Sequence, residues 1–379
     1  MLIQNAIPDA TRSHGLKQLM YFLPHAGKDY ARTRNFDYGP SRRDNVSMLS
    51  PFIRHRLVLE DEILSAVLAQ HTFDDARKFI EEISWRAYFK GWLEHHPSAW
   101  TCYRRDVNAA IARLDADADL FAAYESAISG KTGIEGFDDW AEELVRTGYL
   151  HNHARMWFAS IWIFTLELPW QLGADFFLRH LIDGDPASNT LSWRWVAGLH
   201  TQGKTYLARV SNITSYSNDR FNPVGKLAIT APPLTESDRP TLEALPPADD
   251  IGDVGRVGWL LHEDDCMGRP LVSDIPMPSA ILGLSATAFR SPLAIGQAAS
   301  VFAADAVRDG VTRISEFYQV EGEVTDSARW EDDLMRFAAS HQLDTIVTPF
   351  QTILHVRTNK LDCRAIIHPK LREGWDNLL

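Results

Sequence analysis

The chain has 379 residues, a net charge of −12 at neutral pH and three cysteines. That length suffices for two or three domains with substantial cores. Cys102, Cys266 and Cys363 lie far apart without CxxC spacing, which argues for a reducing compartment and against a zinc site or an iron–sulfur cluster. No apolar run reaches the roughly 18 residues of a membrane span, and the first residues lack a secretory pattern, so we expect a cytoplasmic protein with no membrane partner.

The charge is unevenly distributed along the chain. Residues 1–230 hold 25 Lys and Arg against 27 Asp and Glu, whereas residues 231–379 hold 13 against 23. Binding to nucleic acid depends on Lys and Arg that neutralise phosphates, so the overall charge argues against it. Because the acidity belongs mostly to the C-terminal third, the first 230 residues could still present a local basic face, although scattered arginines are more often ordinary solvated surface.

Apolar periodicity predicts helices through most of the first 223 residues. One candidate helix lies within 1–29, and 30–51 forms a polar loop that ends in Ser50 and Pro51, residues that suit a helix N-cap and first turn. Asp138 is a plausible cap and Gly148 a plausible stop for another helix. The predicted helices cover 52–70, 73–95, 138–147, 151–168 and 173–181.

The pattern changes after residue 230. Residues 232–253 are rich in Pro, Asp and Glu, as linkers are. Beyond them, short apolar segments predict strands at 255–261, 345–349 and 363–368, with helices at 293–308 and 327–341 between them. This alternation is typical of a small α/β domain with a partly parallel sheet. We therefore predict a mainly α protein with a helical domain at 1–230, a linker at 231–253 and an α/β domain at 254–379.

Two polar segments stand out beside an unusual density of tryptophan. They are HNHARM at 151–156 and LIDGDPASN at 181–189, and the helix that follows carries Trp193 and Trp195. A buried charge without a partner costs several kcal/mol. Arg155 is therefore expected to pair with Asp183 or Asp185. Taken on the residues alone, the pair is either a structural ion pair between helices or part of a site for a polar ligand.

Several blocks resemble the flavin-binding helical domain of the photolyase and cryptochrome family. Besides the two polar segments, they are LSP at 49–51, FIEEISWRAYF at 79–89, GKTG at 130–133, WRW at 193–195 and FNP at 221–223. The blocks recur in the family's order over about 30–223. Photolyases usually carry an α/β domain ahead of the helical one, and whether the C-terminal third is a relocated or degenerate version of it stays open.

The resemblance implies an FAD cofactor folded into a U within the helical domain. Its diphosphate would lie at 46–50, where Ser47 and Ser50 match the family's hydroxyls and Val46 lacks one. Asn152 would face flavin N5, since an amide both donates and accepts hydrogen bonds. Asp183 and Asp185 would bind the edge of the flavin ring. The full set of implied FAD contacts is Tyr30, Ser47, Leu49, Ser50, Arg86, Asn152, Arg155, Asp183, Asp185 and Asn189.

The resemblance further implies a deoxyribodipyrimidine photolyase, which repairs cyclobutane pyrimidine dimers in UV-damaged DNA with an electron from reduced FAD. Glu82 would bond the lesion bases, Trp85 would stack on them and Met156 would lie beside it, with Asn152 completing the implied catalytic set. The lesion would be flipped out of double-stranded DNA or taken from single-stranded DNA.

An electron route to the flavin is implied only in part. Trp193 and Trp170 match two tryptophans of the family's chain, whereas the surface position aligns with Ala127, one turn from Tyr124. His153 also stands where many members have Arg. The segment 204–218 lacks the cysteines of the iron–sulfur branch, so no metal cluster is expected.

Two other functions remain open from the sequence. One is a cryptochrome-like blue-light photoreceptor that binds FAD without repairing DNA and uses its acidic C-terminal third as a partner surface. The other is a flavin-free protein that binds nucleic acid or another partner and has kept only the fold. Fold does not prove function, and these alternatives differ in the site rather than in the scaffold.

Overall fold

The computed structural model describes residues 7–245, 255–267, 276–326, 328–348 and 364–367. Within these residues, twelve α-helices precede the first strand: α1 (Arg12–Phe22), α2 (Lys28–Thr33), α3 (Ser50–Arg54), α4 (Glu60–Leu68), α5 (Phe73–His95), α6 (Pro97–Ala116), α7 (Ala118–Ile128), α8 (Phe137–Thr147), α9 (Asn152–Ser160), α10 (Trp170–His180), α11 (Pro186–Val196) and α12 (Val210–Tyr216). A single π-helical turn (Ile161–Thr165) extends α9. Within the described ranges, no helix is long and apolar enough to cross a membrane.

Local sequence signals explain several helix ends. Thr72 caps α5 by accepting a hydrogen bond from Asp75 N at 3.2 Å. Asp185 caps α11 in the same way, with Ser188 N 2.8 Å from its Oδ1. Gly148 ends α8 with φ of 67°, a left-handed conformation that glycine adopts without steric cost. The predictions of a helix at 73–95 and of a glycine stop at 148 are confirmed.

Three helix predictions were wrong. The predicted helix at 52–70 is two short helices, because α3 ends at Arg54 and Arg56 then takes a left-handed φ of 51°. Ser50 is not a cap, since α3 begins at Ser50 itself and the Ser50 hydroxyl bonds the Asp183 carboxylate instead. Asp138 does not cap α8 either. Its carboxylate accepts hydrogen bonds from the backbone N–H groups of 132 and 133 and so fixes the preceding loop.

The C-terminal part forms a parallel five-stranded sheet in the order β3-β2-β1-β4-β5. Its strands are β1 (Val257–His262), β2 (Ala280–Leu284), β3 (Glu321–Thr325), β4 (Thr345–Thr348) and β5 (Arg364–Ile367), and its helices are α13 (Gln297–Tyr318) and α14 (Trp330–Ser340). All described strand pairs are parallel, whereas the sequence predicted a sheet that is only partly parallel. The small α/β fold itself is confirmed.

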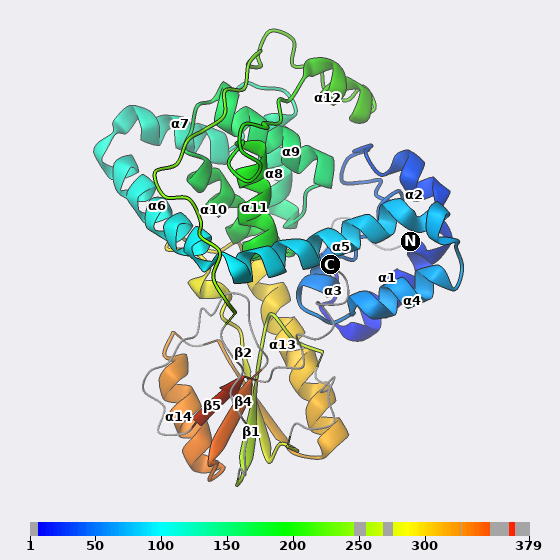
Figure 1. The fold of residues 1–379 in the computed structure, drawn as a ribbon, viewed down its shortest axis with the longest axis vertical. Coiled ribbons are helices and arrows are strands. Elements are labelled where there is room, and N and C mark those ends of the chain that lie inside the picture. The colour runs from blue at the N-terminus through cyan, green and yellow to red at the C-terminus, as the bar shows by residue number, and fades with distance from the viewer. Residues whose placement is uncertain (1–6, 246–254, 268–275, 327, 349–363, 368–379) are drawn as a thin grey trace.

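Alternate residues of β1 and β2 face opposite helices. Trp259 and Ile281 belong to the core cluster that contains α13, whereas Leu260 and Leu282 belong to the cluster that contains α14. A period of two is the expected consequence of strand geometry. The two helices therefore cover opposite faces of the sheet, as Figure 1 shows.

The two main hydrophobic cores are not separated at residue 230 of the chain. One core joins α6 to α12, whereas a second core joins the segment 10–83 to β1, β2 and α13. In Figure 1, α5 runs across the molecule between the upper helices and the sheet. The segment 231–245 of the predicted linker is fixed to the helical part, because Arg194 pairs with Glu236 at 2.6 Å and Leu234 N donates to Ala197 O. The rest of that linker, 246–253, lies outside the described residues. The predicted domain bounds remain a prediction.

Candidate functional site

The turn that joins α10 to α11 brings two acidic side chains into the protein interior. Asp183 and Asp185 are only 5% and 4% exposed, and they flank Gly184. A side chain at 184 has no room, since its Cβ would lie 2.9 Å from Leu181 O and 3.0 Å from Leu178 O. Two carboxylates so close together in the interior need cations, because a buried charge without a partner is costly. The surrounding helices supply these cations.

Arg155 of α9 is the main partner of Asp183. Its Nη2 lies 2.9 and 3.0 Å from the two carboxylate oxygens. Burial by itself raises the pKa of Asp183, but Arg155, the Ser50 hydroxyl and Arg86 together outweigh it and leave the pKa lowered. Asp183 is therefore ionised at neutral pH. Of the two pairings that the sequence left open, the structure has Arg155 with Asp183.

Asp185 is held by cations from two other helices. Lys90 Nζ of α5 lies 3.7 Å from its Oδ2, and Arg54 Nε of α3 lies 3.9 Å from the same atom. Burial raises the pKa of this carboxyl, whereas Lys90, Arg54 and Arg86 lower it and prevail, bringing it to about 2. The turn thus carries two permanent negative charges within a ring of basic side chains.

Arg86 belongs to this ring, and two of its hydrogen-bond donors have no partner among the described residues. Its Nε and Nη2 atoms are buried and have no hydrogen-bond partner among the described residues, and the same holds for the Ser188 hydroxyl at the start of α11. Buried donors are almost always satisfied in folded proteins, and an exception calls for an explanation such as a ligand. Donors of this kind fit an acceptor-rich group such as a dinucleotide, so the residues present are suited to FAD.

The segment before α3 offers mainly backbone groups. Leu49 is fully buried, and its N–H donates to the Ser47 hydroxyl at 3.3 Å. Met48 between them has a left-handed φ of 54°. Ser47 and Ser50 are half-buried, and Ser50 joins the group around Asp183. The structure therefore brings Ser50, Arg86, Arg155 and both aspartates together.

Tyr30, Glu82 and Asn189 contact other partners. Arg34 forms an ion pair with Glu82 and a side-chain hydrogen bond with Tyr30, which links α2 to α5. Asn189 donates from Nδ2 to Ala174 O at 2.8 Å and so ties α11 to α10. Asn189 also meets the turn through its backbone, because its N–H donates to Asp185 O at 2.9 Å. Within the described residues, no hydrogen bond or ion pair joins Tyr30 or Glu82 to the turn 183–185.

Three of the predicted site residues are at least partly exposed to solvent: Trp85, Asn152 and Met156. Trp85 is 50% exposed and packs edge-on against Tyr88, with their ring centroids 5.4 Å apart. Asn152, the first residue of α9, is exposed, and Met156 one turn later is half-buried. Contiguous exposed apolar patches mark binding surfaces, and Trp85 forms such a patch with the exposed Tyr88. These three residues can therefore meet a ligand without rearrangement of the core.

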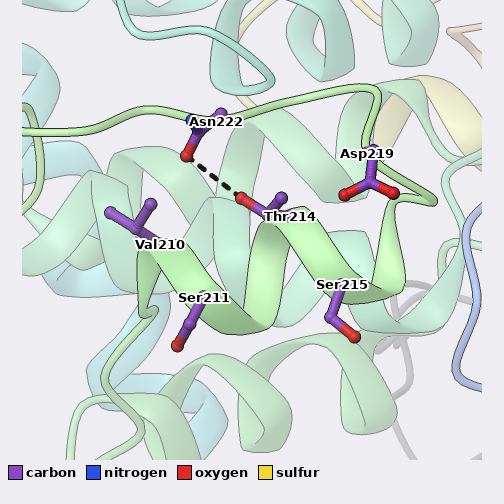
Figure 2. Close-up of a pocket in the computed structure, with 6 residues that line it drawn as sticks. All are labelled: Val210, Ser211, Thr214, Ser215, Asp219 and Asn222. Atoms are coloured by element: carbon purple, nitrogen blue, oxygen red, sulfur yellow. Dashed lines mark hydrogen bonds between the residues drawn. The ribbon is translucent and has the colours of Figure 1, made fainter.

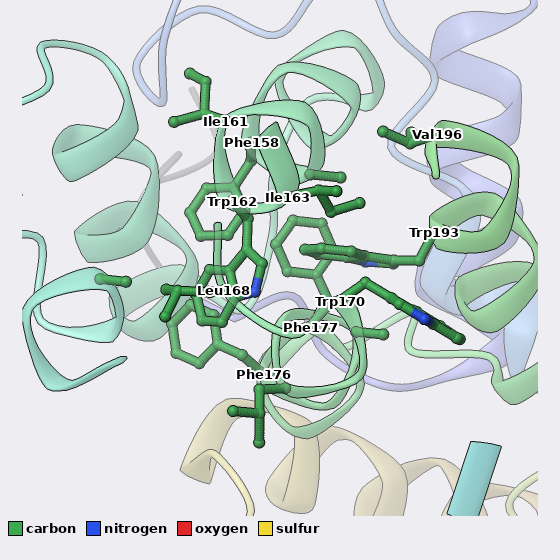
Figure 3. Packing of buried hydrophobic residues seen from close by; sticks show 14 of the residues in the cluster. Phe158, Ile161, Trp162, Ile163, Leu168, Trp170, Phe176, Phe177, Trp193 and Val196 are labelled. Atoms are coloured by element: carbon green, nitrogen blue, oxygen red, sulfur yellow. The ribbon is translucent and has the colours of Figure 1, made fainter. Parts of the chain in front are cut away.

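Trp193 and Trp170 are buried side chains of the helical core (Figure 3). Trp193 meets Trp162 edge-on at 6.2 Å, and Trp162 meets Tyr124 at the same distance. Trp170 lies 5.7 Å from Tyr103. The family's surface tryptophan aligns with Ala127. Ala127 and the nearby Tyr124 are both buried in this structure, so this position does not lie at the surface.

One pocket lies elsewhere, along α12 (Figure 2). Its volume is about 810 Å³ and it is lined by Val210, Ser211, Thr214, Ser215, Asp219 and Asn222. Thr214 donates to Asn222 Oδ1 at 3.2 Å across its floor. The pocket has no basic side chain and none of the predicted site residues, so it does not extend the site.

Sequence reasoning missed four residues of the site: Arg34, Arg54, Lys90 and Ser188. Lys90 follows Arg86 by one helical turn, which places both on one face of α5 and could have identified it. Arg54 has no such signal, because its partners lie more than 100 residues away along the chain.

Comparison with known proteins finds a family that matches the middle of the chain. Residues 79–228 match the model of a family described as the FAD binding domain of DNA photolyase. That range includes most of α5 and all of α9, which supply Arg86, Lys90 and Arg155 of the ring around the turn. It begins after α3 and ends before the sheet.

Individual relatives match over part of their length. The deoxyribodipyrimidine photo-lyase of Alkalihalophilus pseudofirmus is 30% identical over 215 residues, which are 56% of this chain and 42% of that protein. The photo-lyase of Thermus thermophilus is 31% identical over 58% of this chain and 50% of its own length. Among solved structures, a class III photolyase from Agrobacterium tumefaciens has a TM-score of 0.45 and 25% identity, covering 55% of this chain and 43% of that chain. The chain thus spans half or less of these relatives.

Proposed function

We propose that this chain, whose residues 79–228 match the FAD-binding domain of DNA photolyase, acts as a member of the photolyase and cryptochrome family and repairs cyclobutane pyrimidine dimers in DNA under light. The observation that carries the proposal is the position of Trp85. This half-exposed ring stands on α5 next to Arg86, whose buried nitrogens lack partners among the described residues. A stacking surface for a base thus adjoins the donors that suit the cofactor.

The chain's own residues would bind and orient the cofactor. Arg86 would donate to phosphate or ring oxygens, Arg155 fixes Asp183, and Lys90 balances Asp185. Ser47, Ser50 and the Leu49 backbone would hold the diphosphate, and Asn152 would offer an amide to the flavin ring. When bound and reduced, FAD supplies the photoexcited electron that opens the cyclobutane ring and takes it back afterwards.

Recognition of the lesion would depend on Trp85, Met156 and Glu82. A dimer reaches such a site only after it leaves the base stack, as for other enzymes that act on bases. Stacking on an aromatic side chain is worth about 1–3 kcal/mol per base. The Glu82 carboxylate is already oriented by Arg34, and it would accept a hydrogen bond from the extruded bases.

The test is dimer loss in irradiated oligothymidine under blue light with the flavin chemically reduced. We expect repair by the wild type, and a loss of roughly 5- to 150-fold in Trp85→Ala, since one stacking contact is removed. Phe121→Ala is the matched control, because Phe121 is similarly exposed but stands on α7 outside the site. A flavin-loaded wild type that leaves the dimers intact would refute the proposal.

A second candidate is a blue-light photoreceptor without repair activity. It is favoured by strand β3, which lies at the edge of the sheet and exposes Glu321 and Glu323. Charged edge strands resist pairing with other strands, and an acidic edge suits a partner with a basic surface. Light-dependent binding of a partner, lost in Glu321→Gln with Glu323→Gln, together with no repair would favour this function.

A further inference from the structure

The end of α3 joins the acidic turn to the α/β part of the chain. Arg54 is 1% exposed and His55 is fully buried. Arg54 Nε donates to Gly184 O at 2.9 Å, and His55 Nε2 lies 3.4 Å from Ile182 O. These two carbonyls flank Asp183. Arg54 therefore binds the turn on one side of the aspartate that Arg155 binds, and His55 contacts it on the other side.

The opposite ends of the same side chains contact the loop that follows β1. Arg54 Nη1 forms an ion pair with Asp264, and His55 Nδ1 lies 2.6 Å from Glu263 O. His55 O also accepts a hydrogen bond from Cys266 N at 2.9 Å. Because burial lowers the pKa of His55 to about 3, the imidazole is neutral and Arg54 carries the charge of this bridge.

The loop after β1 is itself firmly held. Arg290 binds Glu263 Oε1 through Nε and Nη2 at 3.0 and 2.8 Å. In sheets of this kind, the carboxyl ends of the strands are where ligands usually bind. Here the end of β1, which lies next to β4 across the point where the strand order reverses, receives Arg54 and His55 instead.

We propose that Arg54 is a positioning residue that makes the geometry of the flavin-binding turn depend on the acidic loop after β1. The guanidinium is planar, with Nε toward Gly184 O, Nη1 toward Asp264 and Nη2 3.9 Å from Glu263 Oε1. Because the guanidinium is rigid and planar, the position of the loop after β1 sets the orientation of Arg54 against the turn. A Lys ammonium has no such fixed plane. This inference rests on the proposed use of the turn for FAD.

Asp264→Asn tests the coupling in the full chain, with Asp265→Asn as the matched control. Asp265 follows Asp264 and pairs with Arg56 at 3.2 Å, so each variant removes one ion pair between the same loop and the residues at the end of α3. Among the described contacts, none joins Arg56 to residues 182–185. The measurement is the dissociation constant of FAD, titrated in the dark without DNA, together with the circular dichroism of bound flavin.

We expect Asp264→Asn to weaken FAD binding about tenfold and to alter the flavin dichroism, a size typical of coupling between sites. Asp265→Asn should stay within about twofold of the wild type by the same measure. Asp264→Glu, which keeps a carboxylate, should recover most of the affinity, whereas Arg54→Lys should not. Urea unfolding of each FAD-free variant distinguishes a changed site from a protein that no longer folds.

Equal effects of Asp264→Asn and Asp265→Asn, or an unchanged FAD affinity in Asp264→Asn, would overturn the inference. If Asp264→Asn does not fold, Arg54→Lys and Asp264→Glu decide alone: equal affinity in both would overturn it. A wild type that binds FAD but repairs no dimers refutes the proposed function only. A wild type that takes up no FAD would overturn both.

Discussion

Arg155 binds both oxygens of Asp183 through one nitrogen, Nη2, at 3.0 and 2.9 Å. Its Nε donates to Leu150 O at 3.0 Å, so the guanidinium is also fixed to the segment before α9. Charge-assisted hydrogen bonds of this kind are short and directional. The pair therefore fixes the spacing between α9 and the acidic turn.

Removing one partner of this pair should lower the free energy of unfolding by more than removing both partners does. Arg155→Ala leaves the buried carboxylate of Asp183 without its main cation, and we expect a loss of about 3 kcal/mol in the free energy of unfolding at neutral pH. Adding Asp183→Asn removes the stranded charge and should recover more than half of that loss. Urea denaturation of both single variants and the double variant completes the cycle. Additive losses would show that the two side chains do not stabilise each other.

The lowered pKa of Asp185 should make stability depend on acidity. The carboxyl titrates near 3.8 in the unfolded chain and at about 2 in the folded protein. The unfolded state therefore takes up the proton first, so the contribution is full above roughly pH 5 and is lost as the pH falls from 4 toward 2. It amounts to about 2 kcal/mol.

Urea unfolding at several pH values measures this contribution. Between about pH 6 and pH 3, Asp185→Asn should lose stability less steeply than the wild type by about half of that amount, roughly 1 kcal/mol. Asp74→Asn, in the first turn of α5, is the control and should follow the wild type. Parallel curves for Asp185→Asn and the wild type would contradict the assigned pKa.

Gly173 allows the close approach of Trp193. A Cβ at 173 would lie 2.3 Å from Cη2 of Trp193 and 2.9 Å from Cδ2 of Trp162. We expect Gly173→Ala to destabilise by about 1–3 kcal/mol through overpacking and to change the tryptophan fluorescence. Gly91→Ala is the matched control, because Gly91 is also helical but has open space around its Cβ position. There the gain in helix propensity should stabilise by up to about 1 kcal/mol. A stable Gly173→Ala would show that the tryptophans can shift.

Much of the helical part could be predicted because its signals are local. The bounds of α5 follow from the Thr72 cap and from apolar residues at helical spacing, and the start of α11 follows from Asp185 and Pro186. The ion pair of Arg155 was predictable as a need for a partner, although the choice between Asp183 and Asp185 required the structure. Strand β3 gave no apolar signal, because its residues are exposed or half-buried.

The remaining features depend on contacts between distant parts of the chain. The break between α3 and α4 follows from Arg54 and His55, whose partners lie at 182–184 and 263–264. The shared core of α1, α4 and α13 likewise joins segments more than 200 residues apart. Periodicity and capping within one segment cannot report such contacts. They are also the contacts that tie the site to the sheet.

Arg86 offers the most direct test of the cofactor site. In the FAD-free protein, Nε and Nη2 of Arg86 lack partners among the described residues, so truncating this side chain removes no hydrogen bond from them. Arg86→Ala also removes a positive charge near Asp183 and Asp185, and we expect it to weaken FAD binding by more than it lowers the free energy of unfolding. A hydrogen bond to a charged group contributes about 1.5–3 kcal/mol, which corresponds to roughly a 10- to 150-fold increase in the dissociation constant.

Arg77→Ala is the control for this variant, since Arg77 lies on the same helix and its Nε bonds Glu81 at 2.9 Å on the solvent side. Titration of the FAD-free proteins with FAD, followed by flavin fluorescence, measures both affinities. Arg77→Ala should bind FAD as the wild type does. If Arg86→Ala also binds FAD normally, the partnerless nitrogens of Arg86 do not face the cofactor, and the phosphates must be held by the segment 46–50 alone.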